Sequence, residues 1–179
     1  MSAPEFEIRA ARPADAKAIA ELHVAVWRAT YRDLAPVEAL RKLDVAARLP
    51  RWIEMLDKGE RTILVAEIDG RIVGIGTAGA ATMPELGPRG EILYLYVDRD
   101  CSGRGIGAAL MRRLASSLKA QGYASVALGV VQGNAAAMAF YRKLGGRAAG
   151  SYVDAGPIWR SRNEIVVFDD LDRLITNVD

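Results

Sequence analysis

A glycine-rich segment joins two apolar stretches near the middle of the chain. It reads SGRGIG over residues 102–107, with glycine at every second position. Alternate glycines leave no Cβ to keep a ligand away from the backbone. If a helix begins within this segment, its first N–H groups lack partners and its dipole adds partial positive charge. Such main-chain donors bind phosphate groups, so the segment predicts a phosphate-binding turn.

Three side chains outside this turn are candidates for chemistry. Glu91 heads the apolar stretch before the turn, and strand alternation would place it on one face with Leu93, Leu95 and Val97. A carboxylate in that position suits a general base, and a surface carboxylate at a strand end is an equal alternative. Cys101 adjoins the turn with no base beside it, which indicates a bystander thiol. A lone histidine, His23, is more typical of packing than of catalysis.

The elements that position these residues follow from hydrophobic periodicity. A strand is expected at 91–97, a helix at 106–119, a second strand at 124–131 and a second helix from Asn134 to Gly145-Gly146. Asp69-Gly70 predicts a hairpin turn between earlier strands. The remaining expected elements are strands at 6–9, 61–68, 71–79, 147–153 and 158–168, and helices at 13–30 and 36–58, the latter broken near Asp44 and Pro50.

The expected order is β-α-α-β-β-β-α-β-α-β-β, within one domain spanning residues 1–179. The strand–helix–strand step through the glycine turn needs a crossover, so its two strands should be parallel. The earlier strands form an antiparallel run. The sequence therefore predicts an α/β chain with a mixed, mostly antiparallel sheet flanked by helices.

Composition narrows the possible functions. The chain has 179 residues, of which 51% are hydrophobic, one is cysteine and one is histidine. These counts exclude a disulfide framework and disfavour a metal site made of several histidines. No apolar run has the length of a membrane span, and the N-terminus lacks the pattern of a signal peptide. We therefore expect a cytoplasmic protein that binds neither a metal nor a membrane.

The basic residues are unevenly distributed. The net charge is only +2, yet no Asp or Glu lies between Asp100 and Asp154. That interval carries the basic residues Arg104, Arg112, Arg113, Lys119, Arg142, Lys143 and Arg147. A basic segment around a phosphate-binding turn suggests a small polyanionic ligand, although a solvated basic surface is the plainer interpretation. Nucleic acid is disfavoured, because the basic residues are not interleaved with aromatic ones.

Two common phosphate-binding motifs fit poorly. Residues 103–108 satisfy the loose dinucleotide pattern G-x-G-x-x-A, but that motif expects an acidic residue about 20 positions later and follows the first strand of its fold. Here no acidic residue follows the motif before Asp154, and four expected strands precede the motif in the chain. A P-loop is excluded, because the chain has no Gly-Lys-Ser or Gly-Lys-Thr.

Two motifs together resemble the GCN5-related N-acetyltransferase superfamily (GNAT). Its Gln/Arg-x-x-Gly-x-Gly/Ala motif is matched by Ser102, Gly105 and Gly107, and its Asn-x-x-Ala-x-x-x-Tyr-x-x-x-Gly motif by Asn134, Ala137, Tyr141 and Gly145. Ser102 replaces the usual Gln or Arg. One side-chain contact near the pyrophosphate is therefore in question, whereas the backbone cradle should be unaffected. The resemblance runs from the first strand to Phe168 and is strongest from Glu91 to Gly145.

The resemblance implies acetyl-coenzyme A as the acetyl donor and a fold in which parallel strands four and five splay apart. The pantetheine arm would lie in that gap, and an N–H group of the fourth strand would polarise the thioester carbonyl. Tyr141 would protonate the departing thiolate and Glu91 would be the base, or a water relay would serve. The residues implied in donor binding are Leu95, Tyr96, Val97, Ser102, Gly103, Arg104, Gly105, Ile106, Gly107, Ala108, Asn134 and Tyr141.

The acceptor is less well defined. The first hypothesis is transfer to the primary amine of a small molecule, in a pocket made by Trp27, Tyr31 and the loop 83–89; the two aromatics could equally be core. Two alternatives remain: acetylation of a protein at its N-terminus or a lysine, and a non-catalytic module that senses acyl-coenzyme A. The superfamily also makes a homodimer possible.

Overall fold

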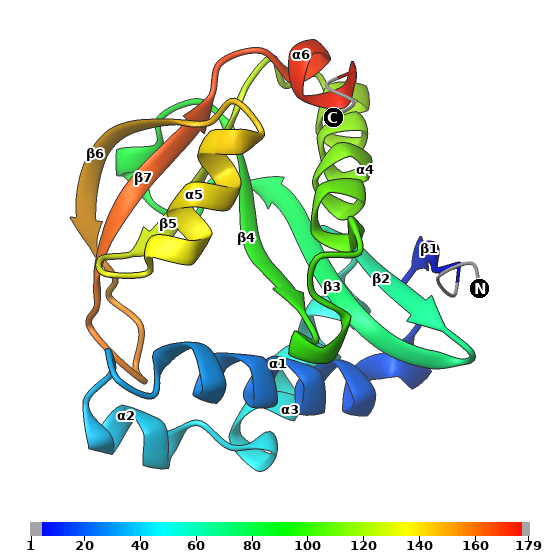
Figure 1. The fold of residues 1–179 in the computed structure, drawn as a ribbon, viewed down its shortest axis with the longest axis vertical. Helices are drawn as coiled ribbons and strands as arrows, with labels where there is room; N and C mark the ends of the chain where they lie inside the picture. Colours follow the sequence, from blue (N-terminus) through cyan, green and yellow to red (C-terminus); the bar gives the residue numbers. More distant parts are fainter. Residues whose placement is uncertain (1–4, 177–179) are drawn as a thin grey trace.

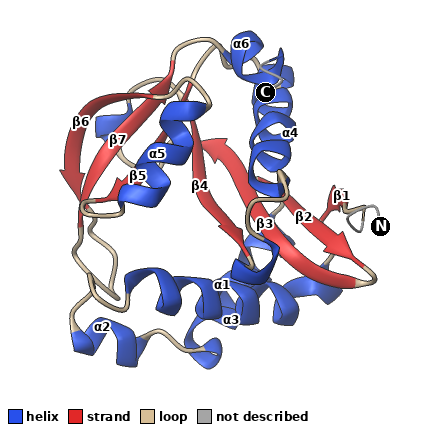
Figure 2. Cartoon of the chain, in the orientation of Figure 1, coloured by secondary structure: helices blue, strands red, loops and turns tan. Residues whose placement is uncertain are grey.

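A single seven-stranded sheet runs through the molecule (Figures 1 and 2). The computed structural model describes residues 5–176. The strand order is β1-β2-β3-β4-β5-β7-β6. The strands are β1 (Glu7–Ala10), β2 (Thr62–Ile68), β3 (Arg71–Ala80), β4 (Gly90–Val97), β5 (Val126–Val131), β6 (Arg147–Val153) and β7 (Arg162–Phe168). The α-helices are α1 (Ala16–Tyr31), α2 (Val37–Lys42), α3 (Val45–Lys58), α4 (Ile106–Ala120), α5 (Ala135–Lys143) and α6 (Leu171–Thr176).

Helices cover both faces of the sheet. One face carries α4 and α5, whose apolar side chains form a core with β2–β5 and β7. The other face carries α1, which packs against β3, β4 and α3. In Figure 1, α1, α2 and α3 lie together below the sheet, and α4 stands beside it. The helix-flanked mixed sheet that the sequence predicts is confirmed.

The middle strands diverge as expected. β4 and β5 are parallel, but they pair only at Gly90 with Val126 and at Glu91 with Ala127. Beyond these two pairs the strands separate, so main-chain groups of β4 are left without a neighbouring strand. The predicted splay is therefore confirmed. The hairpin between β2 and β3 is also confirmed, with Asp69 and Gly70 both at positive φ.

Two expected boundaries are wrong. The break predicted at Pro50 is absent, because α3 continues through it from the Asp44 N-cap to Gly59. Proline removes one hydrogen bond, but Trp52 and Met55 bury the apolar face of α3 against α1 and keep the helix continuous. The last strand begins at Arg162 rather than at residue 158, since residues 154–161 form an irregular segment.

Among residues 5–176, every helix is too short or too polar to span a bilayer.

Candidate functional site

The glycine turn has the backbone conformation that the sequence predicts. Gly103 and Gly105 adopt φ values of 78° and 80°, which L-residues with side chains rarely reach. Gly105 caps α4 without any side-chain hydrogen bond, so the first N–H groups of α4 have no partner within the helix. Ile106 buries its side chain in the core, and Arg104 stays exposed. The turn therefore presents main-chain donors beside the start of a 15-residue helix.

Gly107 has a different role from the other two glycines. A Cβ placed on it would lie 3.2 Å from the Phe140 ring, whereas a Cβ on Gly103 or Gly105 would meet nothing within 4 Å. The missing side chain of Gly107 therefore allows α4 and α5 to approach each other, and does not make room for a ligand. The expectation that all three glycines open the backbone to a ligand is corrected at this position.

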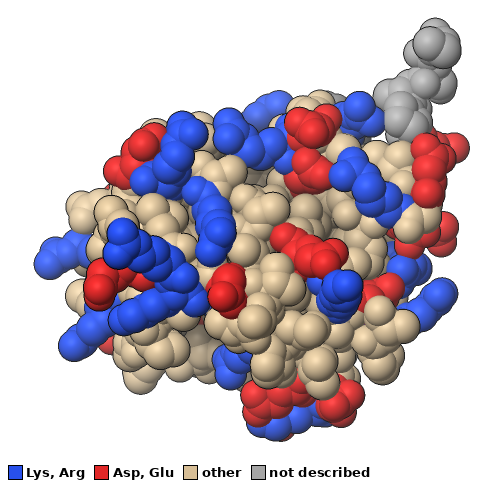
Figure 3. All heavy atoms as spheres, turned by 90° about the horizontal axis from the view of Figure 1, so that it is seen from below, with Lys and Arg blue, Asp and Glu red and all other residues tan. Residues whose placement is uncertain are grey.

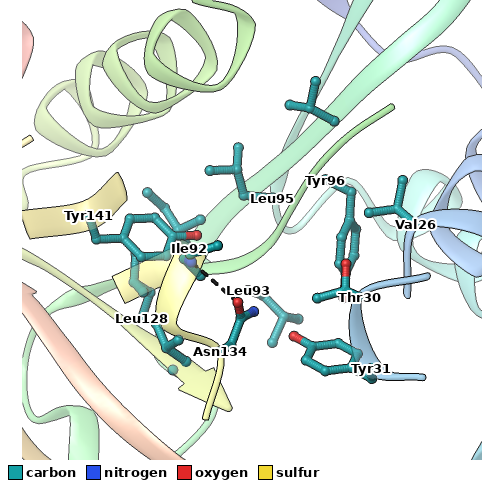
Figure 4. Close-up of a pocket in the computed structure, with 15 residues that line it drawn as sticks. Val26, Thr30, Tyr31, Ile92, Leu93, Leu95, Tyr96, Leu128, Asn134 and Tyr141 are labelled. Carbon is teal, nitrogen blue, oxygen red and sulfur yellow. Dashed lines mark hydrogen bonds between the residues drawn. The ribbon is translucent and has the colours of Figure 1, made fainter. Parts of the chain in front are cut away.

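A cavity of about 260 Å³ occupies the space where β4 and β5 separate (Figure 4). We call it the gap cavity. Tyr94 and Asp98 donate their N–H groups to β3, over 3.2 and 2.8 Å. Because N–H groups alternate along a strand, those of Leu95 and Val97 point away from β3, toward the gap. The backbone of Tyr96 faces β3, so this residue contributes its ring to the cavity, not the backbone contact that we expected.

A β-bulge changes the face of β4 on which Glu91 lies. Thr77 pairs with Tyr94 and the next residue of β3 pairs with Ile92, so Leu93 is the extra residue. Ile92, Leu95 and Val97 pack toward α4, whereas Tyr94 and Tyr96 pack toward α1. Glu91 lies on the α1 side with the two tyrosines. The predicted face shared by Glu91, Leu93, Leu95 and Val97 is therefore wrong, because simple alternation ignores the bulge.

Glu91 is buried, with 2% of its surface exposed, and its carboxylate is held by three donors. The Thr82 N–H donates over 2.9 Å, the Thr82 hydroxyl over 3.0 Å, and the Arg61 guanidinium over 3.3 Å. A carboxylate has about four lone-pair sites. These three contacts fix its position and occupy three of those sites, and Glu91 also lines the neighbouring cavity.

Tyr141 and Asn134 reach the gap cavity from α5. The Tyr141 hydroxyl points into the cavity, near Ile92 (Figure 4). Burial raises the pKa of Tyr141, which keeps the hydroxyl protonated at neutral pH. The Asn134 side-chain oxygen accepts the Ala137 N–H over 3.2 Å and caps α5. Its amide NH₂ lies on the cavity side and interacts with the hydroxyl of Tyr31 (Figure 4).

A second cavity, of about 500 Å³, lies on the α1 side of β4. It shares Tyr31, Ile92, Leu93, Tyr96 and Gly129 with the gap cavity, so the two meet at the splay. We call it the aromatic cavity, because rings from four parts of the chain line it: Trp27, Tyr31, Tyr94, Tyr96, Tyr152 and Trp159. Glu91 and Met83 also line it.

Several residues of this cavity are not apparent from the sequence. Trp27 and Tyr31 were candidates, but Tyr152, Trp159 and Arg48 were not. Tyr152 lies over Gly129 of β5, where an added Cβ would be 2.1 Å from its hydroxyl. Their only signal in the sequence is residue type, since they lie in segments that were assigned to a strand or a broken helix.

His23 lies at the base of the aromatic cavity and is 1% exposed. Its Nδ1 accepts a hydrogen bond from the Trp52 indole N–H over 3.2 Å. Burial, with a smaller effect of the Arg48 charge, lowers the pKa of His23 to about 3. The imidazole is therefore neutral at pH 7 and, with Nδ1 accepting, carries its proton on Nε2. These contacts make it a packing residue, as expected.

Cys101 and the charged surface add little to the site. Cys101 is buried at 4% exposure, and Arg71 donates to its Sγ over 3.8 Å. On the face drawn in Figure 3, Lys and Arg side chains are interspersed with Asp and Glu. Among residues 5–176, no three His, Cys, Asp or Glu side chains gather as metal ligands.

Comparison with known proteins gives a consistent result. Residues 16–146 match the model of the acetyltransferase (GNAT) family. The chain is 29% identical over 134 residues to an L-methionine sulfoximine/L-methionine sulfone acetyltransferase of Pseudomonas paraeruginosa, which covers 74% of this chain and 70% of that protein.

Two solved structures share the fold. One is YncA, a putative acetyltransferase from Salmonella typhimurium with its cofactor acetyl-CoA: TM-score 0.68, 22% identity, 98% of this chain and 96% of that chain covered. The other is a ribosomal-protein-alanine N-acetyltransferase from Brucella melitensis: TM-score 0.67, 27% identity, 91% of this chain and 99% of that chain covered.

Proposed function

The chain belongs to the acetyltransferase (GNAT) family, and on that premise we propose that it transfers an acetyl group from acetyl-coenzyme A to the amine of a small molecule. The observation that carries the acceptor assignment is the aromatic cavity, a ring-lined space of about 500 Å³ that meets the gap cavity at the splay. Apolar, concave sites with a few polar groups are typical of small-molecule binding.

The residues of the chain fit the donor. The turn from Gly103 to Ala108 offers unpaired N–H groups at the positive end of α4, which suits a pyrophosphate. The gap between β4 and β5 offers the main-chain groups of Leu95 and Val97, which suits the amides of an extended pantetheine arm. The side-chain amide of Asn134 adds a donor on the opposite wall.

The two candidate catalytic residues lie on the two sides of this junction. The amine nitrogen attacks the thioester carbonyl, the N–C bond forms, and the C–S bond breaks. Tyr141 gives its hydroxyl proton to the departing thiolate. Glu91 takes the proton that the amine loses, directly or through a water, at the lone-pair site that Thr82 and Arg61 leave open.

Two relatives point toward different acceptors. The Pseudomonas relative acts, by its name, on small amino-acid derivatives, and this supports a small acceptor. The Brucella neighbour acts, by its name, on a ribosomal protein, which makes a protein acceptor the second candidate. A peptide needs an open groove, and the irregular segment 154–161, with Trp159, lines the aromatic cavity instead. We therefore favour the small molecule.

Release of free thiol from acetyl-coenzyme A, measured with a panel of small amines and a panel of peptides, tests the proposal. We expect thiol release with at least one class of small amine. Turnover of peptides alone would transfer the assignment to the protein acceptor. Tight binding of acetyl-coenzyme A, measured by calorimetry, without turnover of any amine or peptide would support a sensing module instead.

A further inference from the structure

Arg48 is a half-buried cation in the wall of the aromatic cavity. Its Nε is fully buried, and no acceptor for it lies among the residues that the structure describes. The Nε of Arg61 is also buried without a partner, but the other nitrogens of that guanidinium bind Glu91 and a backbone carbonyl. Within residues 5–176, no carboxylate forms an ion pair with Arg48, whereas Arg9, Arg61 and Arg71 are all paired with carboxylates. A buried guanidinium donor without a partner is unfavourable, so its site is suited to a ligand that accepts hydrogen bonds.

The charges around the cavity are separated into two ends. At one end, Arg48 lies near His23 and Tyr96. Its charge adds to the effect of burial in lowering the pKa of His23. At Tyr96, burial raises the pKa of the phenol and the charge of Arg48 acts in the opposite direction. At the other end, Glu91 and Asp154 lie near Tyr152: their charges add to burial in raising the pKa of that phenol to about 12.

The carboxylates of the acidic end do not reach Arg48. Glu91 is bonded to Thr82 and Arg61, and Asp154 accepts the Gly156 N–H over 2.7 Å. Arg51, the other cation that lines the cavity, is exposed. The cavity thus combines a half-buried cationic fork, whose Nε has no acceptor, with an acidic end near the splay, where the reacting amine is expected.

We propose that the acceptor is an amine that also carries an acid group, and that Arg48 binds this group. The inference rests on the proposed function and narrows it to amphoteric amines such as amino acids. The planar guanidinium matches a carboxylate or a similar oxyanion through paired N–H donors, and a neutral amide cannot replace that contact. The amine end would then extend toward Glu91, where an ammonium group is favoured.

Amine pairs that differ only in the acid group test this inference. The probes are α-amino acids and ω-amino acids, each paired with its carboxamide, and the readout is kcat/KM from thiol release. We expect the wild type to prefer at least one acid over its amide by about 10- to 100-fold, as the loss of a buried charge-assisted bond implies. Arg48→Met should abolish that preference mainly through KM, and Arg48→Lys should retain part of it.

A matched control and a second readout separate the possible outcomes. Arg41→Met removes an exposed cation of α2 outside both cavities and should leave the preference intact. Affinity for acetyl-coenzyme A should be unchanged in every variant, which also reports folding. If the wild type acetylates amines but never prefers an acid, or if Arg48→Met keeps the preference, the inference is overturned while the proposed function stands. If acetyl-coenzyme A does not bind, or no amine is acetylated, the proposed function has failed and the inference fails with it.

Discussion

The two cavities that meet beside β4 are built in different ways. Apart from its α1 wall, the gap cavity is bounded by the chain between β4 and α5, and its expected binding groups are mostly main-chain N–H and C=O. The aromatic cavity is lined by side chains from α1, α3, β4, β5, β6, β7 and the segment 154–161. One site thus depends on backbone conformation, and the other on which side chains the fold brings together.

This difference has a consequence for substitution. A site made of main-chain groups tolerates changes of side chain, as long as the backbone keeps its dihedral angles. A site made of side chains can change its ligand without any change of fold. We therefore expect substitutions around the gap cavity to affect turnover or donor affinity, and substitutions around the aromatic cavity to affect the choice of acceptor.

The largest effect is expected at Tyr141, the side chain of the gap cavity to which we assign the role of general acid. Tyr141→Phe keeps the ring that packs in the core and removes only the hydroxyl. We expect kcat to fall by about 100-fold or more, the usual scale for losing a general acid. Affinity for acetyl-coenzyme A should change little, because the ring remains. Steady-state kinetics and calorimetry measure the two quantities.

A second tyrosine gives the matched control. Tyr123 packs against the same core but lines neither cavity, so Tyr123→Phe should leave kcat unchanged. An unchanged kcat in Tyr141→Phe would show that another group protonates the thiolate.

The next largest effect concerns stability in the aromatic cavity. His23 has a folded-state pKa of about 3, below the ordinary value of 6.5. Between these values the unfolded chain binds the proton and the folded chain does not, so the free energy of unfolding falls as the pH decreases from 6.5 toward 3. By pH 5 this single group should reduce the stability by about 2 kcal/mol relative to pH 8.

Urea denaturation of the wild type and of His23→Gln, at pH 8 and at pH 5, isolates this contribution. Glutamine does not titrate and can still accept a hydrogen bond from Trp52, so the variant should lose less stability between the two pH values. Equal losses in both proteins would mean that the imidazole is not the group that titrates.

The contrast between the cavities also explains what could be predicted from the sequence. The glycine turn and the hairpin at Asp69-Gly70 depend on local backbone preferences, and such patterns are visible in a single sequence. The splay was expected only from the resemblance to the GNAT superfamily. The GNAT motifs led to the fold, which the structure and the comparisons confirm. The roles of Glu91, Tyr141 and Asn134 stay predictions.

The features that could not be predicted from the sequence are those that tertiary packing decides. The bulge at Leu93 results from the pairing of β3 with β4 and moves Glu91 to the other face. Pro50 stays helical because α3 packs on α1. Arg48 and Trp159 line the same cavity only because α3 and the segment 154–161 come together there from distant parts of the chain. No local pattern reports such encounters.

A pair of glycines in the turn gives a prediction of intermediate size. Gly105→Ala forces a Cβ onto a residue at φ 80°, which costs roughly 1–2 kcal/mol and distorts the donors at the start of α4. We expect about a tenfold loss of affinity for acetyl-coenzyme A. Gly107→Ala instead brings a methyl group to 3.2 Å from Phe140, so it should mainly lower the free energy of unfolding, by about 1 kcal/mol.

Calorimetric titration with acetyl-coenzyme A and urea denaturation of both variants measure these effects. The reverse pattern, with Gly107→Ala losing affinity and Gly105→Ala losing only stability, would contradict the assignment of the main-chain cradle to Gly105.

The smallest effect is expected at Cys101, which precedes the turn in the sequence but lines neither cavity. Its thiol is buried in the core, where Arg71 donates to the Sγ, and is therefore closed off from both cavities. Cys101→Ala should therefore lower the free energy of unfolding by about 1 kcal/mol, the scale of a small core truncation, and leave kcat and KM unchanged. Urea denaturation and thiol-release kinetics test the two parts separately. A variant of normal stability that has lost turnover would give the thiol a chemical role and would make the donor side, like the acceptor side, dependent on its side chains.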